Sequence, residues 1–288
     1  MDDRIKFSLL IGTLNRPEIL LICLNKLKKQ TYKNFEVIII DQSDNDKTEQ
    51  IVKAFSGIDI KYKKVDFRGL SRARNAAIRM MSGTFFCLID DDADYSNRYL
   101  ENVVRHANEK VIVSGYLFDT NTKKGIVNYD KIRNRQHLTL REIIRLCPSA
   151  GLTFPSGTVN TVGLFDEEFG VGAEFGATEE TDYLLRCRKQ GYTILHAPDV
   201  YAEHPIILDQ TPQSSDTPIE KVKRYAMGGG ALYKKHLIYN NEINLIPALV
   251  DNIARLFIKK TISRSDIADT RYYGFIEGWK QYSYKKRD

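Results

Sequence analysis

In the first third of the chain, apolar residues gather in short stretches that predict strands. They lie at residues 7–12, 35–40, 58–62 and 85–89. Between the runs, apolar side chains recur every three or four residues, as they do on one face of a helix. The helices predicted there begin at Pro17, Asp46 and Ser71. Because strands and helices alternate, we expect a mostly parallel central sheet flanked by helices.

The later pattern is less regular. The predicted elements are a helix at 99–108, a strand at 111–114, a helix at 136–146, an ordered stretch at 154–162, a glycine-rich loop at 163–176, a helix at 180–190 and a strand at 193–196. From residue 219 onward the pattern is helical only, and the glycines at 228–230 are expected to interrupt one helix. Residues 210–218 are polar and bracketed by prolines, which is typical of a linker or lid. We therefore expect one domain at 1–209 and a helical region at 219–288.

Composition narrows the functional classes. The chain has 288 residues, of which 42% are hydrophobic, and can bury a substantial core. Its formal net charge of +6 is mild and gives no support for a nucleic-acid partner. Four widely spaced cysteines match neither a zinc site nor a disulfide framework, which fits a reducing cytoplasm. The first residues are charged, and no apolar stretch approaches the ~20 residues of a membrane span, so any membrane contact is expected to be peripheral.

Three consecutive aspartates, Asp90, Asp91 and Asp92, directly follow the apolar run at 85–89. A buried strand therefore places concentrated negative charge at its own carboxyl end. Carboxylates this close raise one another's pKa unless a cation neutralises them, and hard oxygen ligands suit Mg²⁺ or Mn²⁺. Because Mg²⁺ usually binds through one or two carboxylates plus substrate phosphates, the triplet indicates a diphosphate-bearing substrate. The alternative is a solvated acidic turn.

Ligands of open parallel sheets bind at the carboxyl ends of the strands. Thr13 and Asp41 lie at the ends of the first two predicted strands, and the aspartate triplet follows the fourth. We therefore expect these side chains to converge on one crevice, although they are far apart in the sequence.

Several motifs occur in an order that is specific as a set. They are Gly12 to Pro17, Asp41 to Thr48, Gly69 to Asn75, the aspartate triplet, Phe165-Asp166-Glu167, Glu179-Glu180-Thr181-Asp182 and His204. Together they resemble the family 2 glycosyltransferases of the GT-A fold, over about the first 205 residues. The resemblance implies a Rossmann-like domain, and the helical pattern after residue 219 adds a C-terminal helical extension that the resemblance does not cover. The resemblance also implies transfer of a sugar from a nucleotide diphosphate donor to an acceptor hydroxyl.

The resemblance assigns roles around a divalent ion, Mn²⁺ or Mg²⁺. Asp92 is expected to supply the metal carboxylate, with Asp90 as a further ligand. Asp90 or Asp91 would otherwise hold the ribose or a metal-bound water. His204 stands where a family histidine can complete the metal shell. Taken alone, a single histidine beside a strand is as compatible with an ordinary packing or surface role.

Attack by a hydroxyl needs a base. Glu180 matches the family's base position, where an aspartate is common, and Glu179 is its near competitor. A single base implies one displacement with inversion, since retention through a double displacement would need a second carboxylate as nucleophile. The alternative for these acids is a favourable interaction with the helix dipole alone.

The nucleotide half of the site departs from the family. Thr13 and Asp41 are expected near the base and ribose, but Gln42 replaces a second acid that the family commonly carries. A glutamine carbonyl can accept a hydrogen bond from uracil N3 and could equally read thymine, so UDP is favoured without being fixed. Arg72 is expected to reach phosphate and Arg74 to brace the loop.

The acceptor is expected to be a growing glycan or a lipid-linked saccharide, as in polysaccharide biosynthesis, in the cytoplasm or at the inner face of its membrane. An amphipathic stretch at 245–258 could lie on a membrane, pack on the main domain or join an oligomer. Two other functions stay open. A sugar nucleotidyltransferase would need a glycine-rich, lysine-bearing loop, which residues 12–17 lack. A non-catalytic nucleotide-sugar-binding module would be expected to lose its acids, whereas Asp92 and Glu180 are present.

Overall fold

The computed structural model describes residues 5–127, 132, 134–205 and 217–283. The chain divides into two compact units. The sheet unit comprises Met1–Arg68, Arg72–Phe165 and Tyr183–Ile207, and the helical unit comprises Gly69–Ser71, Asp166–Asp182 and Leu208–Asp288. The linker or lid predicted at 210–218 falls mainly on residues outside the described part of the chain. The predicted domain bounds therefore stay a prediction.

The sheet unit is built on four parallel strands, as the apolar runs predict. In spatial order they are β3 (Asp59–Lys64), β2 (Phe35–Asp41), β1 (Phe7–Thr13) and β4 (Phe85–Ile89). The sheet continues from β4 through β8 (Leu152–Pro155), β6 (Val111–Asp119), β9 (Thr193–His204) and β5 (Asp94–Tyr95), and β7 (Gln136–His137) also pairs with β9. Strand β8 is antiparallel to both neighbours, whereas β6 and β9 are parallel. The sheet is therefore mixed beyond β4.

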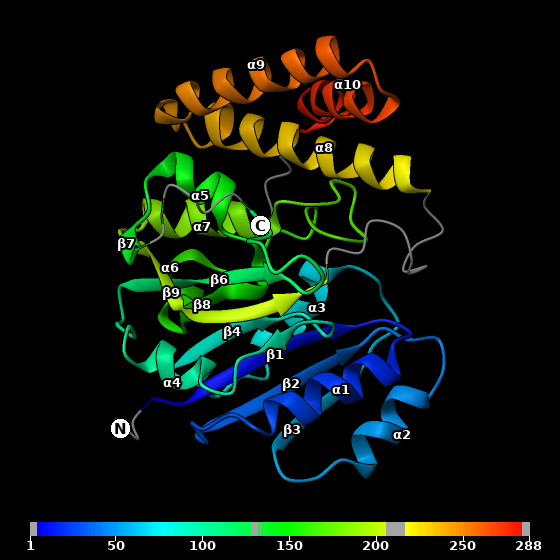
Figure 1. Cartoon of the computed structure of the whole chain (residues 1–288), viewed down its shortest axis with the longest axis vertical. Helices are drawn as coiled ribbons and strands as arrows, with labels where there is room; N and C mark the ends of the chain where they lie inside the picture. The colour runs from blue at the N-terminus through cyan, green and yellow to red at the C-terminus, as the bar shows by residue number, and fades with distance from the viewer. Residues whose placement is uncertain (1–4, 128–131, 133, 206–216, 284–288) are drawn as a thin grey trace. The chain divides into compact units, whose positions relative to one another are not determined.

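Helices cover this sheet (Figure 1). They are α1 (Pro17–Leu27), α2 (Lys47–Ala54), α3 (Leu70–Ile78), α4 (Tyr99–Val104), α5 (Leu140–Leu146), α6 (Gly157–Val162) and α7 (Glu179–Lys189), with a 3₁₀ turn at Ser149–Gly151. Alternate residues of β1 and β2 share one buried cluster with the apolar face of α1. This cluster holds the carboxyl ends of the central strands in register, since Thr13 stands opposite Asp41.

Strands β6 and β9 are longer than predicted, and the helices predicted at 99–108 and 136–146 are shorter. Strand β9 runs to His204 because the chain bulges at residues 198–200: Gly115 pairs with Ala197, but Tyr116 pairs with Tyr201. Pro198 in the bulge cannot donate to a ladder, which is why the sequence pattern ended this strand early. The helix predicted at 136–146 begins only at Leu140, because a capping box starts it and the residues before it form β7.

The helical unit contains three long helices, α8 (Pro218–Lys234), α9 (Ile246–Ser263) and α10 (Asp266–Gln281), and α10 packs against the other two (Figure 1). One π-helical turn (Lys235–Tyr239) and a 3₁₀ turn (Ile243–Leu245) connect α8 to α9. Among the described residues, no helix is both long and apolar enough to cross a membrane.

The expected interruption of a helix at residues 228–230 is wrong, since α8 runs through them. The glycines serve helix packing. A Cβ placed on Gly230 would lie 1.9 Å from the carbonyl oxygen of Phe275, and one on Gly278 would lie 2.0 Å from that of Met227. Real Cβ atoms never approach so closely, so α8 and α10 touch backbone to backbone at these positions.

A buried carboxylate stabilises the amino-terminal end of β2. Glu36 is fully buried and accepts hydrogen bonds from the Ser8 hydroxyl at 2.7 Å and the Ser82 amide at 2.7 Å, while the Lys61 ammonium lies 2.8 Å away. Burial alone would raise the pKa of Glu36, but these hydrogen bonds outweigh it and lower the pKa to about 2. The ionised carboxylate is therefore part of the folded structure.

We predict that Gly230→Ala lowers the free energy of unfolding by about 1–3 kcal/mol, because the added methyl forces α8 and α10 apart. Gly229→Ala is the matched control: its Cβ would lie 3.5 Å from a ring carbon of Phe275, an ordinary contact. That variant should gain up to about 1 kcal/mol from helix propensity. Urea unfolding measures both. Equal effects of the two substitutions would contradict the close packing.

A second prediction concerns the loss of folding stability at acidic pH. The folded-state pKa of Glu36 lies below its ordinary value of 4.5, so its stabilisation is complete above pH 4.5 and is lost as the pH falls toward 2. The loss should be on the order of 3 kcal/mol over this window. In Glu36→Gln this part of the pH dependence of unfolding should disappear. Exposed Glu18→Gln is the control, and parallel profiles for the wild type and Glu36→Gln would refute the assignment.

Candidate active site

The aspartate triplet lies where the sequence predicts it, at the carboxyl end of β4. Strands β1, β2 and β4 are parallel and adjacent, so their ends share one edge of the sheet. There the Thr13 hydroxyl donates a 2.6 Å hydrogen bond to Asp91, and both side chains are buried. The first and fourth strands therefore meet through a direct contact between two predicted site residues.

Arg16 ties the same acids together. One of its terminal nitrogens lies 3.1 Å from Asp91 Oδ1 and 3.0 Å from Asp92 Oδ2, and its side chain is largely buried. Sequence reasoning assigned Arg16 no role. Its position in the loop directly after β1 could have predicted the contact, because a cation there lies at the same edge of the sheet as the acids. Two of the three carboxylates thus share one guanidinium.

Asp90, Asp92 and His204 form the described group that could hold a metal ion, with one donor atom from each within 4.8 Å of the others. His204 ends β9, and its Nε2 lies 3.2 Å from Asp92 Oδ1 and 3.5 Å from Asp90 Oδ2. Arg74, which is almost fully buried, places a guanidinium nitrogen 3.7 Å from Asp90. Two carboxylates and an imidazole suit Mn²⁺ and fit Mg²⁺ less well, since Mg²⁺ prefers oxygen alone.

The pKa values reflect this crowding. Burial raises the pKa of Asp91 to about 6, although Thr13 and Arg16 oppose the shift. Burial would also raise the pKa of Asp92, but the hydrogen bond and charge of His204, together with Arg16, lower it overall. For His204, burial would lower the pKa, but Asp90 and Asp92 raise it to about 10. A cation between these carboxylates is therefore favoured, and without a metal the imidazolium supplies it.

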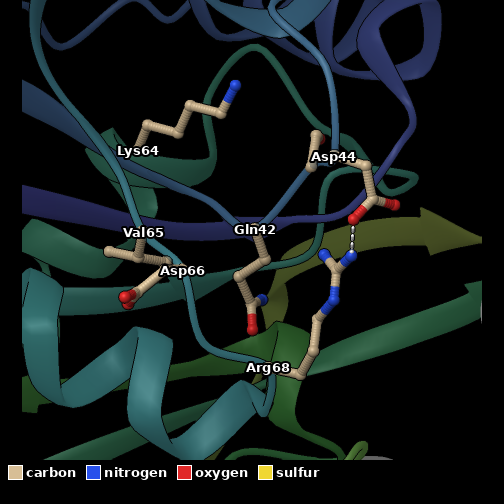
Figure 2. A pocket seen from close by; sticks show the side chains of 7 residues that line it. Gln42, Asp44, Lys64, Val65, Asp66 and Arg68 are labelled. Atoms are coloured by element: carbon tan, nitrogen blue, oxygen red, sulfur yellow. Dashed lines mark hydrogen bonds and ion pairs between the residues drawn. The ribbon is translucent and has the colours of Figure 1, made fainter.

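A cavity of about 390 Å³ lies beside the loop that follows β2 (Figure 2). It is lined by Gln42, Ser43, Asp44, Lys64, Val65, Asp66 and Arg68. Gln42 points into it between the segment of Val65 and Asp66 and the side chain of Arg68 (Figure 2). The Gln42 carbonyl oxygen is buried and has no hydrogen-bond partner among the residues that the structure describes. Such an orphaned acceptor favours a ligand with an N–H group.

The rim of this cavity is fixed by the loops after β1 and β2. Asn15, at a left-handed φ of 54°, receives a hydrogen bond from the Asp44 amide and donates one to its carboxylate at 2.9 Å. Asp44 also pairs with Arg68 (Figure 2). The loops after β1 and β2 are therefore joined by hydrogen bonds beside the cavity.

In the helical unit, the first turn of α7 carries Glu179, Glu180 and Asp182. Thr178 directly precedes it with φ 72°, a conformation that is strained for a β-branched residue. Its hydroxyl donates to the carbonyls of Ala177 and Gly228. Glu179 is only 4% exposed, whereas Glu180 is partly exposed and accepts a hydrogen bond from Thr181. Glu180 is thus the more accessible of the two predicted bases.

A buried ionic network anchors this turn. Asp182 Oδ1 is 2.6 Å from Lys235 Nζ and 3.0 Å from His236 Nε2, and all three side chains are buried. The second nitrogen of His236 faces Glu242 at 2.9 Å. Burial would lower the pKa of His236, but these two carboxylates raise it. No pattern in the sequence predicts this network, because two adjacent residues converge on one acid through the π-helical turn.

The sequence of this chain was compared with models of known protein families. The profile described as Glycosyl transferase family 2 matches residues 8–160, more than half of the chain. The chain belongs to this family. Glycosyltransferase GlyA of Streptococcus pneumoniae is 30% identical over 125 residues, 41% of this chain and 18% of that protein. The chain spans less than a third of the length of the first curated relatives that it matches.

Solved structures of similar fold extend over nearly the whole chain. The mannosyltransferase PcManGT of Pyrobaculum calidifontis, in complex with GDP-Man and Mn²⁺, matches with a TM-score of 0.65 at 15% identity and covers 96% of this chain and 86% of its own. TarS of S. aureus, in complex with UDP-GlcNAc, matches at 0.61 and 15%, covering 97% and 93%. At such identities the likeness shows the fold alone. It confirms the predicted GT-A fold.

Within this family 2 chain, other predicted residues lie as follows. Asp41 is fully buried, where it accepts hydrogen bonds from the Ser43 amide at 2.9 Å and the Tyr62 hydroxyl at 2.7 Å. It therefore shapes the loop that leads into the cavity. Arg72 is exposed, with its guanidinium 4.3 Å from the centre of the Phe67 ring, whereas Arg74 is buried. This difference agrees with the expected division of roles, which itself stays a prediction.

Proposed function

We propose that this family 2 chain transfers a sugar from a nucleotide diphosphate sugar to a hydroxyl of a growing glycan or lipid-linked saccharide. The observation that carries the proposal is the convergence of Asp90, Asp92 and His204 at the carboxyl edge of a GT-A sheet. Departure of a nucleoside diphosphate builds negative charge on phosphate oxygens, and such a site is suited to a cation that offsets it. We place the reaction in the cytoplasm or at the inner face of its membrane.

In this proposal Asp92, Asp90 and His204 would hold Mn²⁺ or Mg²⁺. When bound, the ion would supply charge stabilisation to the leaving diphosphate without proton transfer. Arg16 keeps Asp91 and Asp92 close, and Thr13 orients Asp91. The chain's own residues thereby hold the acids in place before donor binding. The complex of PcManGT with Mn²⁺ supports a divalent ion by analogy.

For the nucleotide, we assign the base to the cavity that contains Gln42. Its orphaned carbonyl oxygen can accept a hydrogen bond from the N3–H of uracil, and Arg68 lies at the rim. We favour uracil, and therefore UDP; thymine offers the same N–H and guanine offers others, so this contact alone does not separate the three bases. The two similar structures hold a UDP-sugar and a GDP-sugar, respectively, and do not decide between them. Arg72 is the proposed phosphate contact.

Glu180 is the proposed base, supported by its partial exposure and by the strained turn before it. Its carboxylate would accept the proton of the acceptor hydroxyl as the new bond to the anomeric carbon forms and the bond to the diphosphate breaks. A single displacement of this kind inverts the anomeric configuration. Retention through a covalent intermediate would require a further carboxylate as nucleophile, for which no residue is a candidate in our assignment.

The metal assignment predicts that Asp92→Asn abolishes Mn²⁺-dependent donor binding. Thermal shift with UDP-, dTDP- and GDP-sugars, with and without Mn²⁺, should show stabilisation of the wild type by one donor class, with UDP-sugars favoured. Asp94→Asn is the matched control, because its exposed carboxylate pairs with Lys26. Donor binding that is unchanged in Asp92→Asn would remove this residue from the site. Binding without any donor cleavage would favour a non-catalytic module.

The base assignment predicts that Glu180→Gln binds the donor normally while its turnover falls by ~10²-fold or more, because the amide cannot accept the proton. Glu179→Gln serves as the comparison, since its carboxylate is buried beside Gly170. Product release in a coupled assay measures kcat for each. A larger loss in Glu179→Gln than in Glu180→Gln would transfer the role to Glu179.

A further inference from the structure

Helix α9 is unusual in that its 18 residues include one buried side chain, Ala248. An apolar stripe runs along its surface at steps of four, three and four residues, which keep to one helical face. The stripe consists of Ile246, Val250, Ile253 and Phe257, which are 50%, 60%, 41% and 52% exposed, respectively. Four large apolar side chains in a row on one exposed face form a contiguous patch that a partner should cover.

Two basic residues stand at the C-terminal end of α9. Lys260 follows Phe257 by three residues on the same helical face, and Arg264, with a left-handed backbone, is the C-cap residue directly after the helix. The acidic residue of α9, Asp251, is paired with Arg255 and stands off the stripe. The stripe on α9 itself is therefore apolar with a cationic end, and the carboxylate that acts on Lys260 is Asp269 of α10.

Aromatic side chains surround this basic end. The Lys260 ammonium lies 3.9 Å from the centre of the Tyr273 ring and 4.8 Å from that of Tyr272. Tyr273 itself is 56% exposed. An exposed tyrosine beside a lysine is a combination that suits the boundary between water and lipid, because each side chain has an apolar body and a polar end.

The charge of the surrounding segment has the same sign. Residues 217–288 contain fourteen Lys and Arg against seven Asp and Glu, which exceeds the net charge of +6 of the whole chain. The preceding residues are together slightly acidic. The positive charge of this protein is thus concentrated in the segment that also carries the exposed stripe.

We propose that the stripe of α9 docks on the surface of an anionic lipid bilayer, with Ile246, Val250, Ile253 and Phe257 in the interface and Lys260 and Arg264 against lipid phosphates. Apolar burial and attraction to anionic headgroups act together in such helices. A second copy of the chain fits less well. Parallel pairing would bring each cation onto its own equivalent, and antiparallel pairing would set Lys260 against apolar side chains with no acid to receive it.

Sedimentation of the full chain with vesicles tests this proposal without requiring sugar transfer. The protein should bind vesicles of phosphatidylcholine and phosphatidylglycerol, bind phosphatidylcholine alone more weakly, and be released by salt. Phe257→Glu should lower the partition coefficient by at least ~10-fold. Lys260→Gln with Arg264→Gln should lower it by about fivefold for each cation removed.

Ile22→Glu is the matched control, because Ile22 is a similarly exposed isoleucine (61%) on α1. It should bind vesicles as the wild type does, and circular dichroism checks that every variant is folded. Absent binding, equal binding to both vesicle types, or an equal loss in Ile22→Glu would overturn the proposal. So would a lipid-free dimer, seen by light scattering, that Ile253→Glu dissociates, since a second copy would then cover the stripe.

Discussion

Three adjacent carboxylates at the end of a buried strand are the constraint on which the site depends. Strand β4 is fully buried, so the chain must neutralise the charge at its tip within the fold. It does so with side chains from separate elements: Arg16 after β1, Arg74 from α3 and His204 from β9. The same arrangement that compensates the charge of these acids also gathers the residues of the candidate metal site, Asp90, Asp92 and His204. The residues that compensate the charge of the aspartates are therefore also the residues on which the proposed chemistry depends.

The helical unit stabilises the first turn of α7, which is acidic and follows a strained residue. Thr178 adopts a left-handed backbone conformation, and Asp182 is fully buried. The hydrogen bond from Thr178 to Gly228 and the ion pairs of Asp182 with Lys235 and His236 compensate both costs. Close packing of α8 on α10 through Gly230 and Gly278 provides the rigid base for these contacts. The C-terminal helices thus support the proposed base.

Features that depend on neighbouring residues in the sequence could be predicted, whereas most contacts between distant residues could not. Strands β1, β2 and β4 were readable because their apolar runs are nearly continuous, whereas β3 was readable only from alternating apolar and polar residues. The edge that gathers Thr13 and Asp91 followed from strand direction alone. His204 could be nominated only by resemblance, since nothing in its neighbourhood predicts a strand that resumes after Pro198. Arg16 and the network of Lys235, His236 and Asp182 were missed, because their partners are distant in sequence and carry no periodic pattern. Gly228, Gly229 and Gly230 were misread as a break, because glycine signals flexibility locally and close packing only in three dimensions.

The bulge in β9 has one more consequence. If the pairing of Gly115 with Ala197 continued without interruption, Tyr201 would stand opposite Asp119 at the end of β6, and the imidazole would lie beyond the ladder. The three residues 198–200 advance the strand so that His204 takes that place instead. A deletion or insertion of a few residues at this point would exchange the side chain presented to the acids while leaving the sheet intact. The number of residues in the bulge thus decides which side chain stands beside the acids, with no substitution at position 204 itself.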